Sequence, residues 1–202
     1  MQLYDLMPSV TSLISYDYSK IKCAEYEQII DALLAKFAHN KGLQMLQVSG
    51  CPGAGKTTYC RKIAGDGAFL SFDAIMESLP SYQKDLQSLG DEAAFARWEM
   101  VARVIGYEVL RRAVERKLGI VLEHSGVNPA HLELFANLKK LGYETCVRVI
   151  KCDLAMAERR AEEREKITHR HTPKKMIEQR FALVNNYIAK YQKIADKVLI
   201  TD

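Results

Sequence analysis

The chain has 202 residues, of which 48% are hydrophobic, and this combination fits one globular domain with a sizeable core. Its formal net charge of +4 is modest and its basic residues are interspersed with acidic ones, so charge leaves a nucleic-acid partner open without indicating one. The five cysteines form no C-x-x-C pair and have no metal-ligand spacing, which argues against a disulfide framework and against a zinc site.

The sequence shows no feature that would direct it to a membrane or out of the cell. The first ten residues include Asp5 and Pro8 and lack a basic stretch before an apolar one, so they do not resemble a signal peptide. No apolar run is long enough to span a bilayer. We therefore expect a soluble, cytoplasmic protein with no membrane partner.

The first 42 residues are expected to form an arm and one helix that packs on the core. Residues 1 to about 18 have no clear period and suggest a loosely packed arm. Apolar residues then recur with the spacing of one helical face up to Phe37. These positions are Tyr26, Ile29, Ile30, Leu33, Leu34 and Phe37. The alternative is that this apolar face is a docking surface for a partner.

Residues 50 to 57, GCPGAGKT, match the G-x-x-x-x-G-K-[ST] pattern of a phosphate-binding loop. An expected strand at 43–48 precedes them and an expected helix at 57–64 follows, which is the context that the motif requires. The glycines let successive N–H groups face inward, Lys56 can reach the β- and γ-phosphates, and Thr57 can ligate Mg²⁺. The predicted phosphate-binding residues are Gly50, Cys51, Pro52, Gly53, Ala54, Gly55, Lys56, Thr57 and Thr58.

Two further expected strands end in carboxylates. The strand at 68–72 stops at Asp73, and the strand at 119–123 ends with Glu123. Ligands of parallel sheets bind at the carboxyl ends of the strands, so we expect both side chains beside the phosphate loop. The alternatives are that Asp73 caps the following helix and that Glu123 is merely solvated.

Helix signals mark the segments between and after these strands. Residues 80–90 are expected to form a loop or short turns, and Asp91 is expected to cap a long helix to about residue 117 in which Trp98 is a core residue. Asn128-Pro129 predicts the start of another helix and Gly142 its end. A fourth strand is expected at 144–151, then a charged helix capped by Asp153.

Thr172-Pro173 repeats the helix-start signature before a last helix to about residue 193. A fifth strand is expected at 197–201. The regular alternation of strands and helices predicts an α/β fold with three layers, in which about five mainly parallel strands carry helices on both faces.

A phosphate loop indicates nucleotide binding but does not specify a reaction. The guanine-specificity motif N-K-x-D is absent, which argues against a GTPase switch, and the chain is short for a motor. A kinase needs a carboxylate for the acceptor hydroxyl and arginines for the transferring phosphoryl group. Arg160, Arg164 and Arg170 are candidates, although glutamates alternate with them and ion pairs on an exposed helix would explain the same pattern.

With these motifs in place, the chain resembles the zeta toxin family of P-loop kinases over roughly residues 25–175. GCPGAGKTT is similar to the family's phosphate loop, and FDAIMESLP to the stretch with its acceptor-activating Asp. The block from IVLEHSG to LKKLGYETCVRVI resembles the family's strand with a substrate-binding Glu and the unit that follows it. Arg164 and Arg170 align with two arginines of the family's lid.

The resemblance implies a P-loop kinase domain at 43–202 that transfers the γ-phosphate of ATP or GTP, with Mg²⁺, to a sugar nucleotide. In the family the acceptor is the 3′-hydroxyl of UDP-N-acetylglucosamine. Asp73 would be the general base or would orient the acceptor hydroxyl, and Lys56, Arg164 and Arg170 would act on the phosphates. The implied acceptor contacts are Asp73, Glu108, Glu123 and Ser125, with Glu108 aligned only across a one-residue gap. A protein antitoxin is an implied partner.

One stretch departs from the family. The family's Glu-Gly-Thr-Gly-Arg is replaced by Glu123-His124-Ser125-Gly126-Val127, so an arginine near the acceptor is missing and a histidine is added. His124 is expected either to make a local hydrogen bond or to contact substrate. Two rival functions stay open: a polynucleotide or nucleoside kinase, and a nucleotide-binding interaction module that transfers no phosphate.

Overall fold

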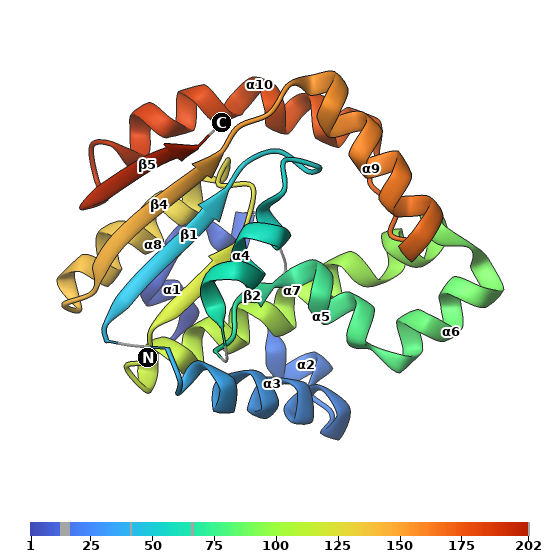
Figure 1. Cartoon of the computed structure of the whole chain (residues 1–202). Helices are drawn as coiled ribbons and strands as arrows, with labels where there is room; N and C mark the ends of the chain where they lie inside the picture. Colours follow the sequence, from blue (N-terminus) through green and yellow to red (C-terminus); the bar gives the residue numbers. More distant parts are fainter. Residues whose placement is uncertain (13–16, 41, 66, 202) are drawn as a thin grey trace.

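The computed structural model describes residues 1–12, 17–40, 42–65 and 67–201, and it is built on one parallel sheet. The strands are β1 (Gln44–Ser49), β2 (Leu70–Ser71), β3 (Ile120–Glu123), β4 (Glu144–Ile150) and β5 (Lys197–Thr201). Their order is β2-β3-β1-β4-β5, and every neighbouring pair is parallel. In Figure 1, helix α4 lies in front of this sheet and α8 behind it. The predicted three-layer α/β fold is confirmed.

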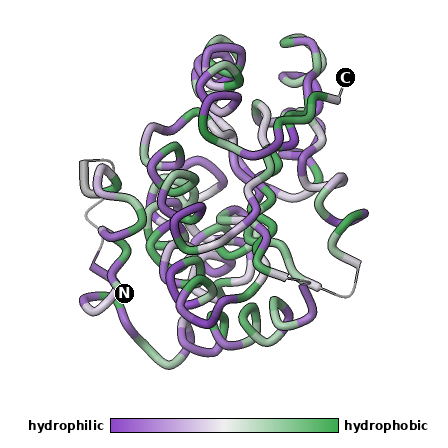
Figure 2. The backbone as a smooth tube through the Cα atoms, turned by 90° about the vertical axis from the view of Figure 1, so that its left-hand side faces the viewer, coloured by the Kyte–Doolittle hydropathy of each residue, from purple (hydrophilic) through white to green (hydrophobic). Residues whose placement is uncertain are grey.

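The helices are amphipathic, as helices that cover a sheet must be. In Figure 2, hydrophilic (purple) and hydrophobic (green) residues alternate along the coiled parts of the tube, which are the helices. They are α1 (Leu3–Leu6), α2 (Tyr18–Ile21), α3 (Ala24–Phe37), α4 (Lys56–Ala64), α5 (Phe72–Ser78), α6 (Pro80–Leu89), α7 (Asp91–Glu115), α8 (Pro129–Lys140), α9 (Leu154–Thr168) and α10 (Lys174–Tyr191), with a 3₁₀ turn, η1, at Pro8–Ser12. In the described part of the chain, none is long and apolar enough to cross a membrane.

Strand pairing brings three strand ends together. Val48 near the end of β1 pairs with Glu123, and Glu123 in turn pairs with Ser71 at the end of β2. Each strand continues directly into a functional segment: the phosphate loop after β1, α5 after β2 and the His124–Val127 loop after β3. The sheet therefore gathers the predicted site at one edge.

The amino-terminal segment is not the loosely packed arm that was expected. Leu3, Leu6, Met7 and Val10 are all buried in the main core. The side-chain amide of Asn137 on α8 also donates to the carbonyl of Leu6, at 3.1 Å. Pieces this short show no sequence period, which is why the expectation failed. Residues 13–16 of the expected arm lie outside the described part.

Helix α3 forms where the apolar period predicts it. Its residues Ile30, Leu34 and Phe37 are buried, and α3 packs against α7. Arg112 of α7 donates to both carboxylate oxygens of Glu27, at 2.7 and 2.9 Å. The face that could have been a docking surface is therefore occupied by the protein's own core.

Residues 80–90 were expected to form a loop or short turns, but they form a helix. Pro80 instead starts α6, since its fixed φ suits a first helical position, and Tyr82 anchors the helix in the core. Asp91 is the first residue of α7 rather than its cap, and Gly90 holds the cap position. Trp98 packs against the core and its indole N–H donates to Asp85 at 2.7 Å, which joins α7 to α6.

The other helix ends give a mixed result. Asn128 caps α8 as predicted, because its side chain accepts from the N–H of Ala130 at 2.9 Å, and Gly142 follows that helix with φ +86°. Thr172 was expected to cap α10, but the cap position belongs to Pro173. The Thr172 hydroxyl is already occupied by a hydrogen bond from Arg164.

Candidate active site

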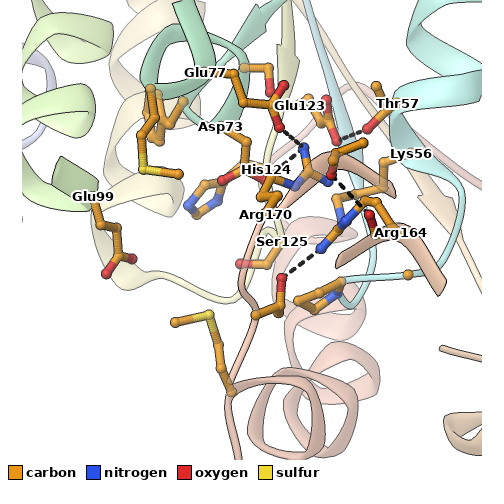
Figure 3. A pocket seen from close by; sticks show the side chains of 18 of the residues that line it. Lys56, Thr57, Asp73, Glu77, Glu99, Glu123, His124, Ser125, Arg164 and Arg170 are labelled. Atoms are coloured by element: carbon orange, nitrogen blue, oxygen red, sulfur yellow. Dashed lines mark hydrogen bonds and ion pairs between the residues drawn. The ribbon is translucent and has the colours of Figure 1, made fainter. Parts of the chain in front are cut away.

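A cavity of about 420 Å³ lies at the carboxyl edge of the sheet. The phosphate loop, α5, α7, the end of β3, α9 and α10 all contribute to its walls (Figure 3). Of the predicted site residues, those that line it are Pro52, Gly53, Gly55, Lys56, Thr57, Thr58, Asp73, Glu123, Ser125, Arg164 and Arg170.

The phosphate loop has the backbone conformation that the motif requires. Gly50, Gly53 and Gly55 have φ values of +146°, +83° and +99°, a region that favours glycine. The loop is also closely packed: a Cβ at Gly53 would lie 2.2 Å from the carbonyl oxygen of Ala157 on α9. Cys51 and Ala54 are buried in a small core with α9 and do not face the cavity.

Lys56 begins α4 and points along the loop. Its ammonium group donates to the carbonyl of Cys51 at 2.9 Å. Burial lowers the pKa of Lys56, and the negative charges of Glu123 and Asp73 oppose this shift. Lys56 is thus positioned among the carboxylates, where an anionic ligand can replace the backbone carbonyl as its partner.

Thr57 and Glu123 form a close polar pair at the base of the cavity. The Thr57 hydroxyl donates to one carboxylate oxygen of Glu123 at 2.6 Å. The other oxygen, Oε2, is buried and has no hydrogen-bond partner among the described residues. An unpartnered buried carboxylate oxygen is costly, so a cationic or donor ligand is expected there.

Asp73 lies in the first turn of α5, one turn before Glu77. The cap of this helix is Ser71, whose hydroxyl accepts from the N–H of Ala74, so Asp73 is not needed for capping. Both carboxylates face Arg170, whose Nη1 is 3.6 Å from Asp73 and 3.2 Å from Glu77. Glu77 was missed by the sequence analysis, although its i+4 spacing from Asp73 was a usable signal.

The arginines of the expected lid divide into two groups. Arg159 pairs with Glu163 on the exposed face of α9, as the alternative interpretation predicts. Arg160, Arg164 and Arg170 instead line the cavity. Arg164 donates to the Thr172 hydroxyl at 2.6 Å, and burial together with the charge of Arg170 lowers the pKa of Arg164. The Nε atoms of Arg164 and Arg170 are buried without partners in the described residues.

Glu108, a predicted acceptor contact, also lies outside the cavity lining. It is buried on α7 and accepts hydrogen bonds from Arg111 and Arg112 at 2.8 and 2.7 Å. It does not line the cavity, whereas Glu99 does. Nine residues are two and a half helical turns, so Glu108 lies on the side of α7 opposite to Glu99.

His124 and Ser125 both line the cavity, on the loop after β3. The Nδ1 atom of His124 accepts from the N–H of Gly126 at 3.1 Å, and its ring stacks on that of His131 with centroids 3.9 Å apart. Burial, with the charge on nearby arginines, lowers the pKa of His124 well below its ordinary value. His124 therefore makes the local hydrogen bond and also faces the cavity as a neutral ring.

One protein-family model matches most of the chain. The Zeta toxin family model matches residues 33–202. A search of curated proteins found no match.

Three solved structures illustrate the fold that the chain shares. The PezAT chromosomal toxin-antitoxin system of Streptococcus pneumoniae is 18% identical with a TM-score of 0.69, and the match covers 92% of this chain and 79% of that chain. AvrRxo1-ORF1 with AvrRxo1-ORF2 and sulphate ions is 11% identical with a TM-score of 0.64, covering 88% and 63%. A candidate kinase from Chloroflexus aurantiacus is 17% identical with a TM-score of 0.56, covering 80% and 89%.

Proposed function

The chain belongs to the zeta toxin family, and from this premise we propose that it is a kinase that transfers the γ-phosphate of ATP or GTP to a hydroxyl of a small acceptor. We propose a sugar nucleotide such as UDP-N-acetylglucosamine as that acceptor. One observation carries the proposal: Lys56, Asp73 and two lid arginines, Arg164 and Arg170, line a single cavity. These are the groups that phosphoryl transfer requires.

The phosphate loop and the lid arginines would hold the donor. The inward N–H groups of the loop and the ammonium of Lys56 bind the β- and γ-phosphates. The guanidinium groups of Arg164 and Arg170 stabilise the charge that spreads over the transferring phosphoryl group. Their Nε atoms have no hydrogen-bond partner among the described residues, so they remain available as donors.

Thr57 and Glu123 fit a magnesium ion. Mg²⁺ prefers oxygen ligands, and here a hydroxyl and a carboxylate lie 2.6 Å apart beside a buried carboxylate oxygen with no partner among the described residues. When bound between these residues and the donor, the ion would neutralise part of the negative charge of the phosphates. We therefore assign Glu123 to the metal side of the site, together with Thr57, rather than to the acceptor.

Asp73 would accept the proton of the attacking hydroxyl. The acceptor oxygen forms a bond to the γ-phosphorus, the bond from that phosphorus to the β–γ bridging oxygen breaks, and the nucleoside diphosphate leaves. Asp73 is half exposed at the cavity wall, and Arg170 holds it from one side. Glu77 shares that arginine and thereby helps to position it.

The metal assignment predicts a change in nucleotide binding. Glu123→Gln should remove most of the Mg²⁺-dependent gain in affinity for the non-hydrolysable analogue AMP-PNP, by about tenfold or more, because a neutral amide is a poor Mg²⁺ ligand. Calorimetric titration with and without Mg²⁺ measures this gain. Glu163→Gln, an exposed substitution on α9, is the control. An unchanged Mg²⁺ dependence in Glu123→Gln would remove Glu123 from the metal site.

The proposed function is tested by incubation with γ-labelled ATP or GTP and a panel of acceptors. The panel contains UDP-N-acetylglucosamine, nucleosides and an oligonucleotide with a free 5′-hydroxyl. We expect label on the sugar nucleotide. Label on the nucleoside or the oligonucleotide would support a nucleoside or polynucleotide kinase instead. Tight nucleotide binding with no labelled acceptor would leave only a binding module.

A protein antitoxin is the partner we propose. The structural neighbour from Streptococcus pneumoniae is part of a toxin-antitoxin system, and this chain shares its fold. Expression of the wild-type chain should slow growth of a bacterial host, whereas expression of Lys56→Ala should not. Equal growth of the two strains would contradict a toxic kinase.

A further inference from the structure

Two arginines that phosphoryl transfer does not use, Arg103 and Arg180, line the same cavity. Arg103 on α7 donates to Glu99, one turn earlier, at 2.5 Å. In Figure 3, Glu99 lies across the cavity from Lys56 and Arg164, so the Arg103 guanidinium is at the end away from the phosphate loop. Arg180 reaches the cavity from α10 and donates to the carbonyl of Val127 at 3.3 Å.

The positive charge at this end is not balanced by the protein. Glu99 pairs with Arg103, whereas Arg180 has only the neutral carbonyl of Val127 and no acidic partner within the described residues. The three side chains together carry a net charge of +1. Burial and the neighbouring charge of Arg103 lower the pKa of Arg180, and the negative charge of Glu99 opposes this shift.

His124 adds a third donor beside these arginines. Because its Nδ1 accepts from the N–H of Gly126, the proton of the neutral ring is on Nε2. No described residue accepts from that nitrogen, and the ring lies between Asp73 and Glu99 in the view of Figure 3. The backbone that fixes His124 is itself held, since the hydroxyl of Tyr191 donates to the carbonyl of Gly126 at 3.0 Å.

We propose that Arg103, Arg180 and His124 form an anion site that binds a phosphate group of the acceptor. The site rests on the proposed function, because it defines which acceptors that function takes. Each of the three side chains can donate a hydrogen bond to a phosphate oxygen, and Glu99, which also lines this end of the cavity, holds Arg103 in place. The donor phosphates and the acceptor phosphate then occupy opposite ends of the cavity, and Asp73 lies between them. The acceptor is a phosphorylated molecule whose reacting hydroxyl is separate from its phosphate.

The test measures binding, so it does not depend on turnover. The phosphate loop is first saturated with AMP-PNP and Mg²⁺. Calorimetry then compares three pairs of phosphorylated and neutral probes: UDP-N-acetylglucosamine with N-acetylglucosamine, UMP with uridine, and glucose 6-phosphate with glucose. The variants are Arg103→Gln, Arg180→Gln and Arg180→Lys. The control is Arg97→Gln, which removes a mostly exposed charge from the same helix as Arg103.

At least one phosphorylated probe should bind the wild type more tightly than its neutral partner. That preference should fall about tenfold or more in Arg103→Gln and Arg180→Gln, be partly kept in Arg180→Lys and be unchanged in Arg97→Gln. Unchanged affinity for AMP-PNP in each variant shows that it is folded. The inference is overturned if no phosphorylated probe is preferred, or if the preference survives both glutamine substitutions.

The two proposals can fail separately. An arginine-dependent preference without label transfer to any acceptor would keep the anion site and reject the kinase. Transfer of label to a neutral acceptor in both arginine variants would keep the kinase and reject the anion site.

Discussion

His131 stacks against His124, and both of its hydrogen bonds can be made by a neutral ring. Its Nδ1 is 2.7 Å from the side-chain carbonyl oxygen of Gln47 and its Nε2 is 3.2 Å from the hydroxyl of Tyr107. A neutral ring donates to Gln47 and accepts from Tyr107, so both contacts are satisfied. Burial and the charges of Arg103 and Arg180 lower the pKa of His131 to about 3.

This burial predicts a loss of stability in mild acid. As the pH falls through 6.5, the unfolded chain takes up a proton on His131, whereas the folded protein does not do so until about pH 3. The free energy of unfolding should therefore fall by about 1.4 kcal/mol for this group between about pH 7.5 and 5.5. In urea unfolding, the free energy of unfolding of His131→Gln should fall less than that of the wild type over this pH range, by that amount. His39→Gln, at an exposed position, should keep the wild-type dependence; identical dependence in both variants would contradict the explanation.

Single residues could be predicted where a motif fixes both residue type and position. Lys56, Thr57 and Asp73 were all found in this way, and all line the cavity. Arg103 and Arg180 were not found, because each is one of 29 basic residues and its role depends on a helix packing that the sequence does not show. Glu108 was aligned across a one-residue gap and does not line the cavity; a shift of one residue turns a helical position by about 100°, which is enough to move a side chain off the cavity wall.

At the level of elements, the phosphate loop and α9 form one packed unit. Cys51 and Ala54 of the loop share a small core with Ala157 and Ala161 of α9 and Ile177 of α10. The helix that carries Arg164 is thus fixed at its amino-terminal end against the loop that binds the donor. Close packing at Gly53 is what makes this contact.

Gly53→Ala should therefore lower the affinity for nucleotide by more than the strain of a positive φ alone would. The new methyl would meet the carbonyl of Ala157, so either the loop or α9 must move. We expect affinity for AMP-PNP to fall about tenfold or more. Gly142→Ala is the matched control, because Gly142 also has positive φ but has open space around it, and it should cost only about 1–2 kcal/mol of stability. Nucleotide affinity lowered equally in both variants would refute the packing argument.

Elements with a strong local signal were predicted closely. Strand β5 and the cap of α8 agree with the expectation, since β-branched runs and an Asn-Pro pair act locally. Helix α6 was missed because it is mostly polar and depends on one buried residue, Tyr82. The start of α10 was misplaced because Arg164, eight residues earlier, takes the Thr172 hydroxyl.

For the whole molecule, the amino-terminal segment is part of the core on which α7 and α8 rest. Leu6→Ala should lower the free energy of unfolding by about 2–5 kcal/mol, because it leaves a cavity at a fully packed site. Leu89→Ala removes a side chain from a half-exposed position and should change it by no more than about 0.5 kcal/mol. Urea unfolding compares the two. An equally small effect of Leu6→Ala would mean that the amino-terminal segment is loosely packed, as first expected.

We propose that one cavity contains a donor end at the phosphate loop and an acceptor end beyond Asp73. The most direct test compares Lys56→Ala and Asp73→Asn for AMP-PNP binding and for transfer of label to UDP-N-acetylglucosamine. We predict that Lys56→Ala loses both, whereas Asp73→Asn binds AMP-PNP like the wild type and transfers about 10²–10⁴-fold more slowly. Transfer by Asp73→Asn at the wild-type rate would contradict the account.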